Sequence, residues 1–299
     1  MTRDPDPVLL TGASGYVGSF LLEELRARGR EPRALVRRPG RLPAGVRECQ
    51  GDAVSGAGLA EALAGCRTAY YLIHSMGRGS GPAADFARRD REAAVNFGAA
   101  ARDAGVRRVI YLGGLGDERA GSSEHLRSRA EVADLLRAHV PELVYVRAAM
   151  VIGAGSASFQ MLRHLVARLP VMVTPRWIDT RTQPVAIRDV VATLADLGEH
   201  PDPPAEVQLG GADVLTYREM MRRFARLQGR RPPLIIRTPV LSPGLSSYWV
   251  ALVTPVKLSL ARPLVHGLSA EMVVRTPPPA GLNDAPLGFD DAVRAALRP

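Results

Sequence analysis

The chain has 299 residues, of which 46% are hydrophobic and 23% charged, and this composition is that of a soluble globular protein rather than a disordered or fibrous one. The net charge is +9, but its basic residues are spread along the chain and Lys257 is the single lysine, which indicates the arginine usage of a GC-rich genome rather than a nucleic-acid partner. Cys49 and Cys66 have neither zinc-site nor disulfide-framework spacing, so we expect no metal. No export signal is evident, which predicts a cytoplasmic protein.

The segment VLLTGASGYVG, residues 8–18, joins a short apolar run to a helical pattern through three glycines. Such a strand, turn and helix presents backbone N–H groups and the positive end of the helix dipole to a pyrophosphate, and glycines allow close approach. The alternative is a glycine-rich turn without a ligand. We predict a dinucleotide site made by Gly12, Ala13, Ser14, Gly15, Tyr16, Val17 and Gly18.

Strand-like and helix-like patterns alternate over the first half of the chain. Apolar runs occur at 8–11, 32–36, 46–50, 68–73, 107–112 and 142–147, and helical patterns at 16–28, 57–64, 82–104, 124–138 and 156–168. This order predicts an α/β protein, a Rossmann-type doubly wound parallel sheet with helices on both faces. We assign residues 1–155 to an NADP-binding domain, and 156–299 to a smaller substrate-binding or lid region interleaved with the Rossmann core.

The second half of the chain is richer in proline. In the segment 213–228, which begins with Asp213, a helix led by Thr216 is expected, because Thr216 and Glu219 have the spacing of a capping box. The apolar segment 238–275 is interrupted by prolines, so we expect no membrane span.

The cofactor is indicated by the residues after the second strand, where Arg37 and Arg38 stand and no acid is present. An acid there binds the ribose 2′-hydroxyl of NAD, whereas an arginine accommodates the 2′-phosphate of NADP. We predict NADP(H), held by these two arginines; the alternative is that they are solvated loop residues. Gly51, Asp52 and Ala53 follow the third strand and are expected near the adenine, with an ordinary turn as the alternative role of Asp52.

Later strands end in polar and small residues, at the sheet edge where ligands bind. Ile73, His74 and Ser75 are expected at the nicotinamide ribose or a substrate carbonyl, although a lone histidine is more often structural. Gly113, with Gly114, allows close approach after the fifth strand. The loop after the sixth strand is expected beside the nicotinamide and comprises Ala148, Ala149 and Met150.

Together these segments resemble the short-chain dehydrogenase/reductase superfamily, in its atypical branch near the NmrA-like NAD(P)-binding proteins. The resemblance rests on TGASGYVG, LVRRPGRL, GDAVSG, YYLIHSMG, VIYLGGLG, HLRSRAEVADLL, VRAAMVIGAGSASF and QPVAIRDVV. Typical members carry a serine on the fifth strand and a Tyr-x-x-x-Lys pair on the next helix. Here the serine position aligns with Gly113 or Gly114, and the pair aligns with His125 and Arg129.

The resemblance implies an NADPH-dependent ketoreductase that lacks the usual tyrosine acid. The candidate catalytic residues are His74, Ser75, His125 and Arg129, where Arg129 would replace the lysine on the nicotinamide ribose and the proton would come from His125, water or a substrate hydroxyl. We expect a bulky apolar ketone as substrate, such as an aromatic polyketide of antibiotic biosynthesis, and a monomer or homodimer. The alternative is a non-catalytic NADP(H) sensor that acts through a protein partner.

Overall fold

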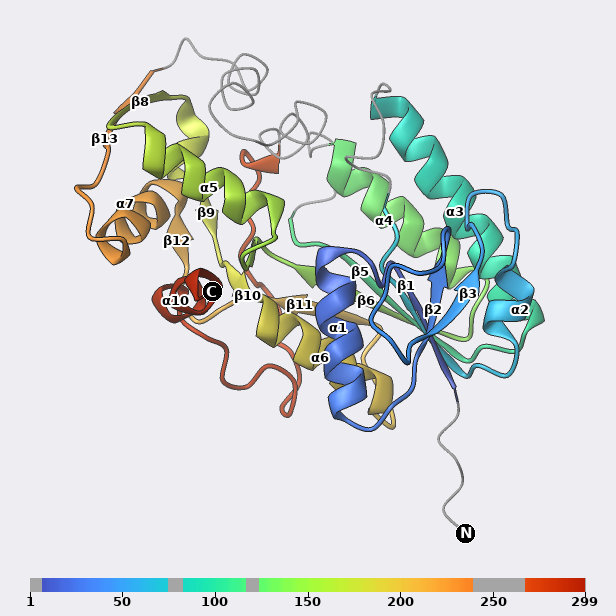
Figure 1. Ribbon diagram of the computed structural model, residues 1–299. Helices are drawn as coiled ribbons and strands as arrows, with labels where there is room; N and C mark the ends of the chain where they lie inside the picture. Colours follow the sequence, from blue (N-terminus) through green and yellow to red (C-terminus); the bar gives the residue numbers. More distant parts are fainter. Residues whose placement is uncertain (1–6, 75–82, 117–123, 239–266, 299) are drawn as a thin grey trace.

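The computed structural model describes residues 7–74, 83–116, 124–238 and 267–298 (Figure 1). Its centre is a seven-stranded sheet with the order β11-β6-β5-β4-β1-β2-β3, in which every neighbouring pair is parallel. The strands are β1 (Val8–Thr11), β2 (Arg33–Val36), β3 (Arg47–Gln50), β4 (Thr68–Tyr71), β5 (Arg108–Gly114), β6 (Glu142–Ala148) and β11 (Glu206–Leu209). The predicted α/β fold with a doubly wound parallel sheet is confirmed.

The direction in which the sheet grows reverses beside β1. The chain first builds β2 and β3 on one side of β1 and then returns to the other side for β4. In an open parallel sheet, ligands bind at the carboxyl ends of the strands that flank such a reversal. The topology therefore points to the residues that follow β1 and β4.

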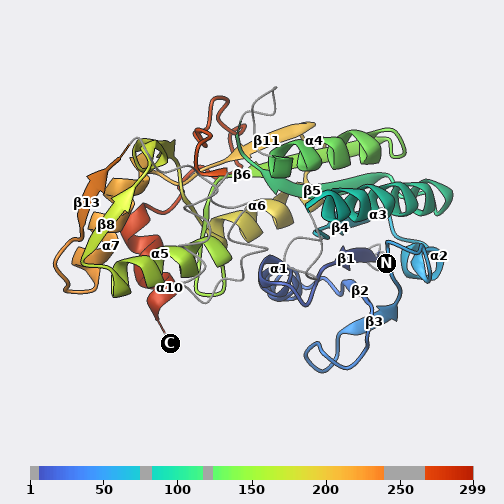
Figure 2. The same ribbon diagram turned by 90° about the horizontal axis from the view of Figure 1, so that it is seen from above.

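Helices cover both faces of this sheet (Figure 2). One face is covered by α1 (Tyr16–Ala27) and α6 (Ile187–Glu199), and the other by α2 (Leu59–Leu63), α3 (Ala83–Asp103) and α4 (Glu124–Arg137). Alternate residues of each strand face opposite layers, so Leu10 packs toward α1 while its neighbour Leu9 packs toward α2 and α3. Both leucines are fully buried, as is usual for parallel strands.

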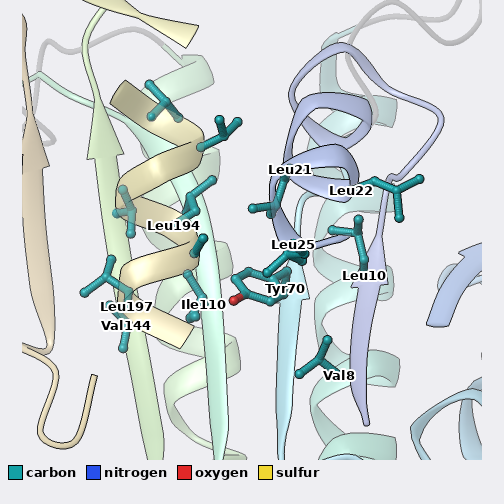
Figure 3. Close-up of a cluster of buried hydrophobic side chains, with 14 of the residues drawn as sticks. Val8, Leu10, Leu21, Leu22, Leu25, Tyr70, Ile110, Val144, Leu194 and Leu197 are labelled. Atoms are coloured by element: carbon teal, nitrogen blue, oxygen red, sulfur yellow. The ribbon is translucent and has the colours of Figure 1, made fainter. Parts of the chain in front are cut away.

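The core between the sheet and the α1–α6 layer is shown in Figure 3. Leu21 and Leu25 of α1 meet Leu194 and Leu197 of α6 over the strands, with Tyr70 of β4 between them. Each such side chain contributes about 1.5–3 kcal/mol through burial. The contact between α1 and α6 joins the start of the chain to its second half, and so fixes where the second half lies.

The remaining elements form a smaller lobe beside the sheet. Its core unites α5 (Ala157–Arg168), α7 (Tyr217–Leu227) and α10 (Phe289–Leu297) with the short helix η1 (Arg176–Asp179). Three two-stranded pairs complete it: β8 (Val171–Thr174) with β13 (Leu234–Arg237), β9 (Arg181–Thr182) with β12 (Leu215–Thr216), and β7 (Val151–Ile152) with β10 (Val185–Ala186). Figure 1 shows this lobe on the far side of α6 from β3.

The capping box expected at Thr216 is present. The Thr216 amide donates to the Glu219 carboxylate at 2.7 Å, and the Glu219 amide donates to the Thr216 hydroxyl at 3.2 Å. Because the cap fixes where α7 begins, this helix starts at Tyr217, directly after Thr216 as expected. These contacts lower the pKa of the Glu219 carboxyl, since the backbone amide of Thr216 stabilises its charged form.

Two absences hold for the described residues alone. None of their helices combines the length and the apolar character needed to cross a bilayer. They also bring together no group of three His, Cys, Asp or Glu side chains that could hold a metal ion.

Candidate active site

The end of β1 is tied to the end of β4 by one buried threonine. The Thr11 hydroxyl donates to the carbonyl of Tyr70 at 3.1 Å and accepts from the amide of Leu72 at 2.9 Å. The chain then turns at Gly12, whose φ of +71° is strained for any residue with a side chain. A Cβ on Gly12 would also lie 3.0 Å from the Leu72 carbonyl oxygen. This glycine therefore allows the β1 turn to lie directly against β4.

The other two glycines bring the turn close to the start of α1. The Gly15 amide donates to the Gly12 carbonyl at 2.8 Å, and a Cβ on Gly18 would lie 2.1 Å from that same oxygen. Gly15 is the N-cap of α1, and no side chain caps the helix. The first amides of the helix are thus left to a ligand or solvent, a feature that fits a pyrophosphate. Ala13 contributes backbone only, because its side chain is buried in the core.

Arg37 and Arg38 follow β2 at the same edge of the sheet. Both are exposed, and within the described parts of the chain neither is hydrogen-bonded or ion-paired. Their position after the second strand is the one from which an arginine reaches a 2′-phosphate.

The turn after β3 is packed tightly against its own chain. A Cβ on Gly51 would lie 2.7 Å from the Ala57 carbonyl oxygen, and Ala53 is buried against α2 and α3. The Asp52 carboxylate accepts the Val54 amide at 2.8 Å, as in an Asx-turn. These contacts favour the turn role of Asp52 over a contact with the adenine.

A pocket of about 550 Å³ lies between the carboxyl edge of the sheet and the smaller lobe. The sheet side contributes several of the predicted site residues, which are Tyr16, Val17, His74, Arg129, Ala148, Ala149 and Met150. The lobe side is mostly apolar and includes Met161, Leu165, Trp177, Met220, Met221 and Met272. Ile73, by contrast, packs against the core beneath α2 and α3. The structure therefore brings one part of the predicted site together at the pocket, while Arg37 and Arg38 lie outside its lining.

Gly113, at the serine position of the family, lies where a tyrosine ring passes. A Cβ on Gly113 would lie 2.5 Å from Cε2 and 2.8 Å from the hydroxyl oxygen of Tyr145. The Tyr145 ring stacks on that of Tyr111, its partner in the β5–β6 register, with ring centres 5.3 Å apart and planes at 9°. The Tyr145 hydroxyl thus lies where a side chain at position 113 would begin. No motif or spacing in the sequence identifies Tyr145 as a site residue. A signal that could have found it is the absence of the family's serine on one strand together with a tyrosine on the neighbouring strand.

Arg129 of α4 is buried at the pocket wall and is 7% exposed. Burial acts to lower the pKa of Arg129, but the Tyr111 hydroxyl and the Asp90 carboxylate outweigh it and raise the pKa overall. Tyr145 acts in the same direction. The site therefore holds a permanent cation at the position of the family's lysine.

Two predicted catalytic side chains cannot be placed. Ser75 lies outside the described residues. His125 lies in the first turn of α4, but its side chain also falls outside the described part of the structure. Both stay predictions from the sequence.

Comparison with known proteins agrees with this geometry. The family described as NAD(P)H-binding matches residues 12–151. The ceramide reductase of Caulobacter vibrioides is 32% identical over 306 residues, covering 97% of this chain and 95% of that protein. The chain is an atypical short-chain dehydrogenase/reductase. A second relative, the 3-beta-hydroxysteroid dehydrogenase of Mycolicibacterium neoaurum, is 35% identical over 120 residues, which are 37% of this chain and 32% of that protein.

Solved structures share the fold of this reductase-family chain at low identity. The NADPH-dependent quinone oxidoreductase of Escherichia coli, complexed with NADPH, superposes with a TM-score of 0.76 at 18% identity, covering 97% of this chain and 100% of the other. The triphenylmethane reductase of Citrobacter, complexed with NADP(H), gives 0.74 at 19% identity, again covering 97% and 100%. The protein is thus an NAD(P)H-dependent oxidoreductase with a Rossmann-type cofactor domain.

Proposed function

We propose that the protein is an NADPH-dependent reductase that acts on a ketone of a bulky, apolar substrate. The observation that carries this proposal is the placement of His74 and Arg129 at the wall of an apolar pocket beside the glycine turn. A volume of about 550 Å³ is within the range of sites that enclose small molecules. Of the two functions considered from the sequence, the oxidoreductase relatives support the enzyme over the sensor.

The cofactor would be held by the backbone amides at the start of α1 and by Arg37. The guanidinium of Arg37 matches the geometry of a 2′-phosphate and would select NADPH over NADH. NADPH, when bound, supplies the hydride that reduces the carbonyl carbon.

Arg129 would act as a fixed hydrogen-bond donor and positive charge. An arginine does not release its proton near neutral pH, so it can orient the ribose or the substrate oxygen but cannot serve as the acid. Tyr145 would be a positioning residue, since its hydroxyl fills the space left by Gly113 and favours the charge on Arg129. In this way the pair would replace the family's serine and lysine.

His74 would donate the proton to the carbonyl oxygen. In the described lining of the pocket the other titratable side chains are Arg129 and two tyrosines, and burial raises the pKa of both the Tyr16 and the Tyr217 phenols. Imidazole is the side chain that ordinarily exchanges its proton near neutral pH. His74 also follows β4, one of the strands beside the reversal of the sheet, where the cofactor is expected to bind.

The lining of the pocket favours a flexible apolar chain on the substrate. Of the protein's eight methionines, five belong to the described lining of the pocket: Met150, Met161, Met220, Met221 and Met272. Methionine side chains adapt to irregular and mobile apolar groups, so this lining suits an acyl chain better than a rigid polycycle. The relative named ceramide reductase supports a lipid, and the class of substrate that we propose is a long-chain lipid ketone; the aromatic polyketide expected from the sequence stays a prediction.

Oxidation of NADPH, followed by its absorbance, tests the proposal with three ketones: a long-chain lipid ketone, its short-chain analogue and an aromatic polyketide. We expect turnover of the long-chain ketone and little of the short one. A preference for the polyketide would overturn the lipid assignment. Tight NADPH binding without turnover of any of the three would favour the sensor.

Two substitutions test the roles of the residues. His74→Gln should lower kcat by about 100-fold or more, with a small change in KM, because general acid catalysis contributes about 10²–10⁴-fold. His164→Gln is its matched control, because His164 is a half-buried histidine of α5 outside the pocket lining. Arg129→Gln should lower kcat/KM, whereas Arg129→Lys restores the family's residue and should recover most of the activity. Arg137→Gln, exposed on the same helix, should change neither. An unchanged kcat in His74→Gln would remove this residue as the proton donor.

A further inference from the structure

The pair of strands β8 and β13 exposes a row of apolar side chains on the outside of the smaller lobe. Their inward residues, Met172 and Ile235, are 1% and 7% exposed. The outward residues are about half exposed, at 49% for Val171, 48% for Val173, 60% for Leu234 and 48% for Ile236. We name these four outward side chains the β8–β13 face.

The register makes this face continuous. Leu234 pairs with Val171 and Ile236 with Val173, so the four side chains form two adjacent rows on one side of the two-stranded sheet. Other large apolar side chains that are exposed in the described residues, Phe20, Val54 and Val95, lie apart in α1, the turn after β3 and α3. Single exposed apolar residues are ordinary, whereas a clustered patch marks an interaction surface.

The chain around this face is strongly basic. The arginines are spread along the whole sequence, but the acids are not: residues 143–178 and 220–270 contain no Asp or Glu. Both strands of the face come from these two segments. Exposed arginines lie close to both strands in sequence: Arg168, Arg230 and Arg231 just before them, and Arg176 and Arg237 at or beyond their ends. Asp179, which ion-pairs with Arg237 at 3.4 Å, adds one negative charge at this edge.

We propose that the β8–β13 face docks the protein on the surface of an anionic phospholipid bilayer. Apolar side chains of this kind enter the boundary between headgroups and acyl chains, while arginines extend their charged ends to lipid phosphates. Each arginine near such a surface adds about fivefold to the partition of a protein onto it.

The chemistry of the face disfavours two other occupants. A second copy of the chain would bring two arginine-rich borders together, and like charges repel across such a contact. A nucleic acid would match the charge, but its bases are recognised by aromatic and hydrogen-bonding side chains, and Val, Leu and Ile offer neither.

The placement of the face suits an enzyme with an apolar pocket. Met172 and Ile235, on the inner side of the two strands, belong to the same packed core as Met161 and Leu165, which line the pocket. Figure 2 shows β8 and β13 at the opposite end of the molecule from β3 and α2, so the cofactor domain would stay away from the membrane. Docking does not depend on the reductase proposal, because it is measured without substrate.

Vesicle co-sedimentation of the full chain tests the docking. We expect the protein to sediment with an equal mixture of phosphatidylcholine and phosphatidylglycerol, to bind phosphatidylcholine alone far less, and to lose binding as salt is raised. The double variant Arg230→Gln/Arg231→Gln should bind the mixed vesicles about 25-fold less tightly, from about fivefold for each arginine. Leu234→Ser/Ile236→Ser should weaken binding by about tenfold or more.

A control variant carries similar changes at the other end of the protein. Val95→Ser/Arg102→Gln alters one exposed apolar and one exposed basic residue of α3 and should bind vesicles as the natural chain does. All variants should keep their Tm and NADPH affinity, which shows that they are folded. Absence of vesicle binding, or variants of the β8–β13 face that bind normally, would overturn the proposal. The proposal would also be overturned if the Leu234→Ser/Ile236→Ser variant changed from a dimer to a monomer. It would be overturned as well if the protein bound an oligonucleotide but not the vesicles.

Discussion

The region around the seven-stranded sheet, here called the cofactor half, and the smaller lobe are subject to different physical constraints. In the cofactor half, seven parallel strands and a glycine turn fix backbone positions to within van der Waals contact, as Gly18 does against the Gly12 carbonyl. In the lobe, strands of two to four residues pair in twos, and helices α5, α7 and α10 meet through adaptable side chains such as Met220 and Met221. The first region depends on backbone geometry, and the second on the volume that its side chains fill.

This difference allows the two regions to diverge separately. A cofactor that is shared by many reductases constrains the turn and the sheet. The lobe encloses whatever substrate the particular enzyme acts on, and so a matching lobe says more about substrate than a matching sheet.

The largest effect is expected in the cofactor half, at the glycine turn, where backbone geometry is limiting. Gly18→Ala would place a Cβ 2.1 Å from the Gly12 carbonyl oxygen, and relief of that overlap must move the turn away from α1. We expect a loss of about 3 kcal/mol or more in the free energy of unfolding or in NADPH binding, equal to about 100-fold in affinity. Ser19→Ala, one residue further along α1, is the control. A Gly18→Ala variant with both a normal free energy of unfolding and normal NADPH binding would show that the turn is less constrained than its geometry indicates.

The next effect tests whether Gly113 is needed because of Tyr145. Gly113→Ala would put a Cβ 2.5 Å from the Tyr145 ring, and overpacking of this kind costs about 1–3 kcal/mol. Tyr145→Leu removes the ring edge, so the same alanine should cost much less in that background. Denaturant unfolding of the two single variants and the double variant measures the coupling. Additive changes would contradict the contact.

A smaller effect, on nucleotide affinity, is expected from the exposed arginine that follows β2. Arg37→Gln should weaken NADPH binding by about tenfold, since hydrogen bonds to charged groups contribute about 1.5–3 kcal/mol, and should leave NADH binding unchanged. Arg47→Gln, also exposed but on β3, is the matched control. Fluorescence titration with both nucleotides measures the ratio. Equal losses for NADPH and NADH would show that Arg37 does not contact the 2′-phosphate.

The smallest effect is expected in the lobe, where volume rather than backbone is limiting. Met272→Phe replaces a flexible side chain at the pocket wall with a rigid ring and should shift kcat/KM toward shorter ketones by about 1 kcal/mol, or about fivefold. Met172→Leu changes a buried methionine of the same lobe that does not line the pocket, and should leave the chain-length preference unchanged. If Met272→Phe and Met172→Leu had the same chain-length preference, the lining of this pocket would not determine which substrate is reduced.

Much of the cofactor half was predictable because its signals are local. The six strands expected in the first 150 residues are present with ends shifted by at most two residues, and α1, α3 and α4 lie where their helical patterns indicate. Apolar runs bounded by glycine or proline, and caps such as the Thr216–Glu219 pair, depend on neighbours a few residues away.

The second half was expected to be interleaved with the Rossmann core, but the elements that it contributes, β11 and α6, were not predicted. β11 is only four residues long and lies in a proline-rich segment, and α6 has no strong cap. Both are stabilised by contacts with distant residues: β11 pairs with β6, and α6 packs against α1. The sequence pattern around them carries little of that information, because the stabilising partners lie more than 50 residues away.

By itself, the sequence determined the fold class, the glycine turn and the family of cofactor, because these depend on backbone conformations that particular residues at fixed spacing impose. Only the tertiary structure decided that Tyr145 occupies the space beside Gly113, that Arg129 is a buried cation at the pocket, and that five methionines belong to the described lining of one pocket. It also decided that two acid-free segments come together in the β8–β13 face. Each of these depends on packing between residues far apart in the chain, and packing is set by the whole core rather than by any one segment.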